Sequence, residues 1–373
     1  MLDTANVNTR KSNFELLRIV AMLMIIAHHF ASHGILHVLD GNVAYVIWRN
    51  GRSINKIISC LYAPGGKIGV GIFFMLTGYF LINKHSYSLK KVVIESAFYG
   101  LINSIIYIIC LYFGAYPMPE SKVSSILIPT ILAIFNPATG GVWWFVSSYI
   151  MLILLLPFFN KLLKCFTKKG YFIFLVLFWI IWYSIGSLGT PFYNVTIGIF
   201  FYCIGGYIKI YGKKTIFRRK IIFFAIFSIF WIIDAYCIYS NALNLSNSSA
   251  IKNLFFNQIQ TSFCWPICAI SMFKIFDSIN IGFNKIINKI ASTTFGIYLI
   301  HDFVPFRYLI WNKLLKVDTL YASRLFPLYA LLVVVAVFIV CSIIDMIRQT
   351  LFEPKMLQIG TSLINRFRKK YMR

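Results

Sequence analysis

Residues Asn13–His33, NFELLRIVAMLMIIAHHFASH, form a hydrophobic stretch long enough to cross a lipid bilayer as one helix. Arg18 lies near its start, and His28, His29 and His33 lie near its end, with only apolar side chains from 19 to 27. Ionisable groups are costly inside a membrane helix, so they favour a functional site over a plain anchor. The length of this apolar run and the region after it argue against a cleaved signal peptide.

Helical geometry predicts which of these groups share a face. Arg18 and His29 are 11 residues apart, which corresponds to roughly 16 Å and to within about 20° of three full turns. His28 lies about 80° from Arg18 on the same wheel. Glu15, three residues before Arg18, is within reach of the guanidinium.

Two interpretations of the Arg18–His29 pair follow. In the first, Arg18 extends to the lipid headgroups and His29 lies at the opposite interface. In the second, both side chains face a cavity, where Arg18 holds an anionic ligand. His29 then acts as a general base, since a neutral imidazole accepts a proton from an alcohol near neutral pH.

The composition indicates a membrane protein. Of the 373 residues, 59% are hydrophobic and 13% are charged, whereas soluble domains carry about 25% charged residues. The formal charge of +25 could suggest nucleic-acid binding, but the basic residues are dispersed in short loops between apolar segments, so we expect none. The eight cysteines lie mostly in apolar runs without a CxxC motif, which predicts neither disulfides nor a zinc site.

Ten apolar segments predict an all-α, polytopic integral membrane protein. The expected spans are 14–35, 66–83, 92–114, 142–159, 171–188, 193–211, 220–240, 257–277, 287–307 and 325–347. The run 124–135 is short and contains Pro129, so it is re-entrant or interfacial, or else an eleventh span.

Loop charges predict the orientation. With ten spans and both termini cytoplasmic, 26 of the 36 Lys and Arg residues lie inside and 10 outside, in agreement with the positive-inside rule. We therefore expect one transmembrane domain over residues 1–350 and a basic cytoplasmic tail over residues 351–373.

A metal site at the end of the first span is not expected. His29 and His33 have the i, i+4 spacing of a metal-binding pair, but the only further candidate ligands nearby in sequence are His37 and Asp40. The sequence alone therefore predicts no metal.

The second apolar segment contains GKIGVGIFFMLTGYF, residues 66–80. Its glycines predict either close helix packing or a break in the backbone. Thr77 is a polar group in mid-span, and it either lines a cavity or belongs to the packing.

Two later stretches carry aromatic and polar groups. GVWWFVSSY, residues 141–149, places Trp143 and Trp144 either in an interfacial aromatic belt or in the wall of a sugar site. STTFGIYLIH, residues 292–301, ends at His301, which is either an interfacial residue or a second polar group near the acceptor. Glu95 and Asp234 lie within predicted spans and therefore need buried partners, which the sequence does not name.

Taken together, four stretches resemble the membrane-bound acyltransferase-3 family, whose members O-acylate extracytoplasmic polysaccharides. The family's first span carries an Arg, ten residues and a His, matched here by Arg18 and His29. Its pattern GVxxFFxLSGY is similar to GVGIFFMLTGYF, with Thr77 in the Ser place, and WWFVSSY and FGIYLIH resemble two later motifs. The resemblance covers about residues 13–347.

The resemblance implies a donor, an acceptor and roles for individual residues. Acetyl-CoA or another acyl-CoA would load from the cytoplasm with Arg18 on the CoA moiety, and His29 would be the catalytic base. The family's RxxR motif after the second span is absent, and Lys84, Lys90 and Lys91 occupy that loop. Lysine binds phosphate as a point charge, without the bidentate fork of arginine.

The resulting prediction is an O-acyltransferase, with acetyl the expected group, in a prokaryotic inner membrane. The acceptor would be a cell-surface polysaccharide or its lipid-linked precursor, near Thr77, Trp143, Trp144 and His301. The main alternative is a transporter or flippase for lipid-linked saccharide or acyl groups, which would show paired broken helices in two related halves. A glycan polymerase is a third reading, for which the 37–65 loop, with Arg49 and Arg52, is the only candidate external loop.

Overall fold

A computed structural model describes residues 11–36, 48, 51–84, 87–114, 142–186, 193–212, 219–243 and 262–371. Every regular element among them is a helix. The elements are α1 (Ser12–Ala31), the π-helical turn η2 (Ser32–Leu36), α3 (Ser53–Tyr62), α4 (Gly65–Leu81), α5 (Lys90–Tyr112), α7 (Trp144–Lys164), α8 (Lys168–Gly186), α9 (Tyr193–Tyr211), α10 (Lys220–Leu243), α12 (Cys264–Ser278), α13 (Lys285–Ala291), α14 (Thr294–His301), α15 (Phe306–Tyr308), the π-helical turn η4 (Leu309–Leu314), α16 (Val317–Leu320), α17 (Phe326–Leu351) and α18 (Glu353–Tyr371).

Seven helical stretches in the described part of the chain are long and apolar enough to cross a membrane. They are Ser12–Ile35, Ser53–Leu81, Lys90–Tyr112, Trp144–Lys164, Asn194–Tyr211, Lys220–Ser240 and Phe326–Leu351. The prediction of an all-α polytopic membrane protein is therefore confirmed. Of the other predicted spans, 171–188 corresponds to α8 and 257–277 to the 15-residue α12. The run 124–135 lies outside the described residues.

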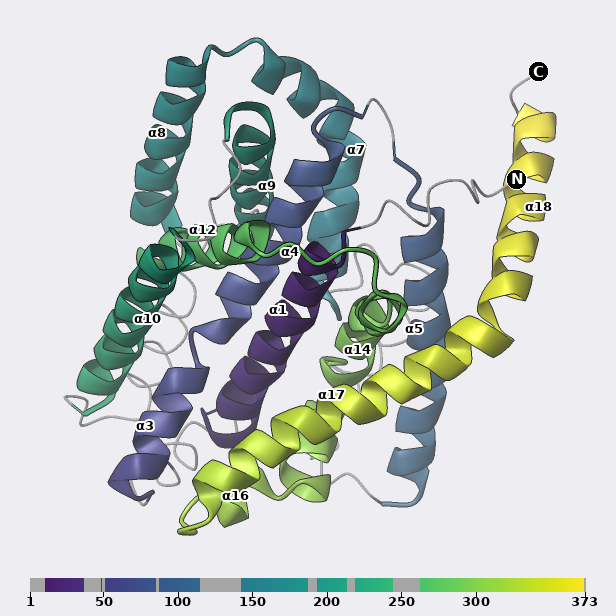
Figure 1. Ribbon diagram of the computed structural model, residues 1–373. Helices are drawn as coiled ribbons and strands as arrows, with labels where there is room; N and C mark the ends of the chain where they lie inside the picture. The colour runs from purple at the N-terminus through teal and green to yellow at the C-terminus, as the bar shows by residue number, and fades with distance from the viewer. Residues whose placement is uncertain are drawn as a thin grey trace.

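Helix α1 lies at the centre of the bundle (Figure 1). It contacts α3, α4, α12, α13, α14 and α17. Leu17 and Ala21 lie on one side of the helix and Ile26 on the opposite side, and all three are fully buried. A helix that is apolar on all sides is expected to be surrounded by others, so the composition of 19–27 explains the central position.

The glycines of α4 allow close helix contacts. A Cβ atom on Gly69 would lie 2.6 Å from the carbonyl oxygen of Ala21 on α1, and one on Gly78 would overlap the carbonyl oxygen of Tyr202 on α9. The packing interpretation of these two glycines is therefore the one the structure supports. Their spacing turns one face of α4 toward α1 and another toward α9.

The predicted span 287–307 is not one continuous helix. Helix α13 ends at Ala291 and α14 begins at Thr294. The hydroxyl of Thr293 donates to the carbonyl of Ile290 (2.7 Å), and that of Thr294 donates to the carbonyl of Ala291 (2.9 Å). These side chains bond to backbone carbonyls of the last turn of α13, where the regular helical pattern ends. The break makes α14 a short helix that ends at His301, beside α1.

Both acidic residues within the predicted spans have partners. Glu95 on α5 pairs with Arg348 on α17, and the Asp234 carboxylate accepts a hydrogen bond of 2.5 Å from the hydroxyl of Ser262. Beyond α17, the predicted tail is largely helical, because α18 continues at an angle to α17 after a break at Phe352 (Figure 1).

Candidate active site

The first half of the candidate site lies at the C-terminal end of α1, where two histidines from distant parts of the chain meet. His29 Nδ1 lies 2.9 Å from His301 Nε2 on α14. Both side chains are buried, at 8% and 0% exposure. The sequence placed these residues at similar depth, and the structure brings them into direct contact.

A chain of hydrogen bonds determines which nitrogen of His29 carries the proton. His301 Nδ1 lies 2.6 Å from the carbonyl oxygen of Ile297, which can only accept, so His301 Nδ1 carries a proton. When both rings are neutral, His301 Nε2 is therefore an acceptor, and His29 Nδ1 donates to it. The lone pair of His29 consequently lies on Nε2, the atom that a general base needs.

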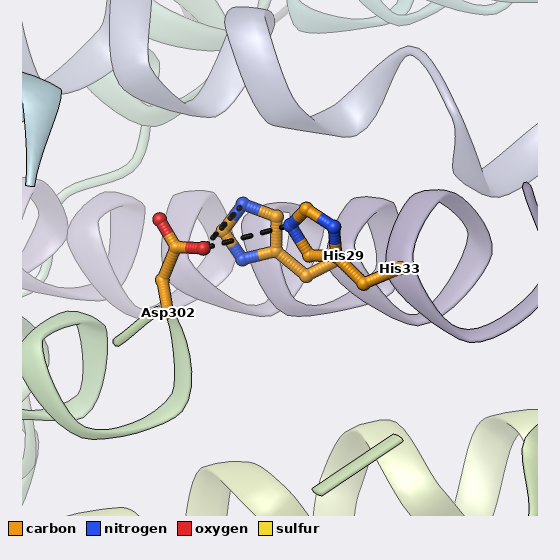
Figure 2. Close-up of side chains that lie close together, drawn as sticks. All are labelled: His29, His33 and Asp302. Carbon is orange, nitrogen blue, oxygen red and sulfur yellow. Dashed lines mark ion pairs between the residues drawn. The ribbon is translucent and has the colours of Figure 1, made fainter. Parts of the chain in front are cut away.

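Asp302, the residue after α14, faces this lone pair. Its Oδ1 lies 3.7 Å from His29 Nε2 and 3.5 Å from His33 Nε2. Figure 2 shows the carboxylate directed toward both rings. Arg307 binds the same oxygen, with Nη2 at 2.7 Å and Nε at 2.9 Å. Near the histidine pair the sequence offered only His37 and Asp40 as further ligands, whereas the fold brings the carboxylate of Asp302 to the pair from a distant segment.

The second half of the site lies at the start of α1. Arg18 Nη1 donates to both carboxylate oxygens of Glu15, at 2.9 and 3.1 Å. Glu15 is 2% exposed, whereas the Arg18 side chain is 25% exposed. The buried carboxylate of Glu15 therefore binds and positions the partly accessible guanidinium of Arg18.

Arg18 lines two cavities. The larger, of about 520 Å³, contains four basic and two acidic side chains. Its charged residues are Lys11, Glu15, Arg18, Lys209, Lys274 and Asp277. The excess of basic groups makes it suited to an anionic ligand.

The smaller cavity, of about 300 Å³, leads toward the histidines. Its lining includes Arg18, Lys91 and Thr77, and also Ile25 and Tyr298, which belong to later turns of α1 and to α14. His29 is four residues after Ile25, which is about 6 Å along the helix. The cavity therefore extends from the guanidinium to within about one helical turn of the histidine contact.

The three lysines predicted to share one loop differ in position, because Lys90 and Lys91 begin α5 and only Lys84 precedes it. Lys91 lines the smaller cavity and pairs with Glu353 at 2.8 Å. Lys90 contacts the hydroxyl of Thr361 on α18. Lys84 is exposed and lines neither cavity among those described.

The other histidine of the pair at 28 and 29 points elsewhere. His28 Nδ1 donates to the carbonyl oxygen of Ala63 at 2.6 Å. Its ring lies against Gly66, where a Cβ would lie 2.5 Å from ring carbons. His28 thus belongs to the packing of α1 on α4, as its helical phase indicated.

Trp143 and Trp144 differ in burial and in the groups they contact. Trp143 is 1% exposed and packs on Phe303, with ring centroids 5.5 Å apart. Trp144 is partly exposed and lies under the ammonium group of Lys67, which is 4.0 Å from the ring centroid. In this structure Trp143 offers no exposed ring face to a sugar, and Trp144 is the one beside a charged group.

Sequence reasoning did not identify Asp302, Arg307 or Lys67 as site residues. Asp302 follows the FGIYLIH motif directly, so its place next to His301 was the available signal. Arg307 is five residues later, beyond a break that the prediction of one continuous span concealed. Lys67 is one of the ten charges that the loop count assigns to the outside, whereas its side chain is buried in the structure.

Comparison with known proteins gives one match. A family model described as an acyltransferase domain matches residues 11–346. No curated protein and no solved structure gives a significant match. The matched range includes Arg18, His29, His301 and Asp302, and ends within α17.

Proposed function

The chain belongs to the acyltransferase-3 family, and we propose that it transfers an acyl group, with acetyl the expected one, from acyl-CoA to a hydroxyl of a cell-surface polysaccharide or its lipid-linked precursor. The observation that carries this proposal is the position of His29. Its Nε2 lone pair faces away from His301, and a cavity from Arg18 ends one helical turn short of it.

The two cavities suit the two parts of acyl-CoA. The diphosphate and the nucleotide would occupy the larger, basic cavity, where Arg18, Lys209 and Lys274 offer positive charge. The pantetheine arm would extend through the smaller cavity, whose inner wall contains Phe145 and Tyr298. Arg18 lies on both cavities, so it would contact the phosphates at their junction.

The chemistry is a direct transfer. His29 Nε2 accepts the proton of the acceptor hydroxyl as its oxygen attacks the thioester carbonyl carbon. The C–O bond forms, the C–S bond breaks, and the CoA thiolate leaves and takes up the proton from the imidazolium. While His29 is protonated, the carboxylate of Asp302 at 3.7 Å stabilises its positive charge.

The acceptor would approach His29 from the side opposite the donor cavity. Trp144, with the ammonium group of Lys67 over its ring, is a candidate for contact with a sugar ring, and Lys67 is a candidate for contact with an anionic group. His301 serves this reaction as a positioning residue, because it fixes the tautomer of His29. In the proposed orientation the Arg18 end is cytoplasmic and the His29 end faces outward, with the cell membrane as the location.

The test is label transfer in membranes containing the full-length protein. Membranes are incubated with acetyl-labelled acetyl-CoA and surface polysaccharide, and the label is followed into alkali-labile ester. The wild type should form ester, His29→Ala should form none at equal protein level, and His28→Ala should behave as the wild type. Full ester formation by His29→Ala would refute the role of His29.

The same assay separates the enzyme from a transporter or flippase. A transporter would move labelled acyl groups or lipid-linked saccharide across sealed vesicles without forming a new ester. Transport of label with no ester in the polysaccharide would replace the proposed function by that alternative.

A further inference from the structure

His29, His33 and Asp302 form a cluster with the composition of a metal site. One ligand atom from each lies within 4.8 Å of the others. Two imidazoles and a carboxylate are a ligand set that Zn²⁺ accepts, with a fourth position left open. We propose that this cluster binds a divalent transition-metal ion such as Zn²⁺, and that the bound ion inhibits the enzyme by occupying His29 Nε2.

The spacing of the ligand atoms fits a tetrahedral ion. Zn–N and Zn–O bonds of about 2.0–2.2 Å place neighbouring ligand atoms roughly 3.3–3.6 Å apart in a tetrahedron. The His33–Asp302 separation is 3.5 Å and the His29–Asp302 separation is 3.7 Å. The ligand atoms of the two histidines also lie within 4.8 Å of each other, so side-chain movements can close the site around an ion. Figure 2 shows one oxygen of Asp302 facing a nitrogen of each ring.

The surroundings of the cluster also favour coordination. His29 Nδ1 donates to His301, which leaves Nε2 for a metal and orients the ring, as second-shell partners of metal-bound histidines do. Asp302 Oδ2 is buried and lacks a well-formed hydrogen bond among the residues that the structure describes, and the group beside this carboxylate is the Tyr298 hydroxyl. A buried carboxylate oxygen without a well-formed hydrogen bond is costly, and a cation would satisfy it.

Arg307 is the group that opposes the ion. Its guanidinium binds Asp302 Oδ1 at 2.7 Å and places a positive charge next to the site. The arginine side chain is 28% exposed, so it can withdraw toward solvent when a cation enters. The His29 and His33 side chains are 10% and 14% exposed, which gives an ion access to the cluster.

The inhibitory part of this inference rests on the proposed function, because it requires His29 Nε2 to act as the base. A metal-bound nitrogen has no lone pair with which to accept the hydroxyl proton. The binding part requires only the three ligands. The two parts therefore need separate measurements.

Binding is measured by equilibrium dialysis of purified full-length protein against ZnCl₂. The wild type should hold about one Zn²⁺ that His33→Ala lacks, whereas His28→Ala, which alters a neighbouring histidine outside the cluster, should retain it. The Arg307→Gln variant should bind Zn²⁺ more tightly than the wild type, because it lacks the positive charge next to the site. Co²⁺ replacement should give a visible spectrum without thiolate charge-transfer bands, which excludes binding by cysteines. No bound ion in the wild type, or an ion retained by His33→Ala, would overturn the site.

Inhibition is measured in the label-transfer assay. ZnCl₂ should reduce ester formation at least tenfold in the wild type and leave His33→Ala unaffected, with reversal by a chelator. Equal inhibition of both proteins, or none in a wild type that binds the ion, would overturn the inhibitory mechanism. If no ester forms under any condition, the proposed function fails while the dialysis result still decides the site.

Discussion

Arg348 on α17 and Glu95 on α5 form a buried ion pair, with Nη2 3.0 Å from Oε1 and both side chains less than 5% exposed. The same guanidinium lies 2.6 Å from Asp345 and 3.1 Å from Glu353. One arginine thus joins α5, α17 and the start of α18. Since Glu95 and Lys91 also line the smaller cavity, this network fixes one wall of the proposed donor site.

We expect Arg348→Met to destabilise the protein strongly. The substitution leaves three carboxylates close together without their shared cation, and breaking a buried pair in this way costs about 3–5 kcal/mol. Thermal unfolding in detergent should show a markedly lower midpoint. Adding Glu95→Gln to Arg348→Met should recover part of the loss, and additive effects of the two changes would show that the pair is not coupled.

Removing His301, which fixes the tautomer of His29, should slow catalysis without weakening donor binding. In His301→Phe, His29 loses its acceptor at Nδ1, and its proton can move to Nε2, where it blocks base catalysis. We expect kcat to fall at least about tenfold, with KM for acyl-CoA nearly unchanged. A changed KM with an unchanged kcat would assign His301 to substrate binding instead.

Glu15 should act through Arg18. In Glu15→Gln a neutral amide replaces the buried carboxylate that binds the Arg18 guanidinium. The amide attracts the guanidinium less strongly, so Arg18 is held less firmly in position to bind phosphate. We expect KM for acyl-CoA to rise several-fold, and Arg18→Ala to raise it further. Lys84→Ala changes an exposed lysine outside both cavities and is the matched control. If Lys84→Ala had the larger effect, the phosphates would bind at the loop rather than in the cavities.

The contact between α4 and α9 should not tolerate a methyl group. A Cβ on Gly78 would overlap the carbonyl oxygen of Tyr202, whereas one on Gly282 would meet nothing within 4 Å. Gly78→Ala should therefore destabilise the protein by about 1–3 kcal/mol, and Gly282→Ala should not. Equal melting temperatures of the two variants would show that α4 and α9 can separate at little cost.

The sequence allowed the helical architecture and much of the site to be predicted, because both depend on local patterns. Apolar runs indicate membrane helices, and helical phase alone placed Arg18 and His29 on one face. The break at Ser292 and Thr293 was missed because hydropathy averages over a window and does not register side chains that cap carbonyls. The apolar run continues on both sides of that break.

Contacts between residues far apart in the sequence could not be predicted either. Nothing local to His33 indicates Asp302, and nothing local to Glu95 indicates Arg348. Both pairs arise only when α14 and α17 pack beside their neighbours. The burial of Trp143 beside the more accessible Trp144 is a similar case, because adjacent residues of one helix end differ only in what the rest of the bundle places against them.

Because Arg18 and His29 both lie on α1, the helix fixes the distance between them. A rigid helix keeps the anion-binding group and the base roughly 16 Å apart, and no loop movement can shorten that separation. If Arg18 binds the phosphates and His29 is the base, as proposed, the donor needs a long arm between its phosphates and its activated carbonyl. Acetyl phosphate, whose carbonyl carbon is bonded directly to a phosphate oxygen, would be too short to reach both groups, so the proposed roles of Arg18 and His29 favour acyl-CoA over this donor.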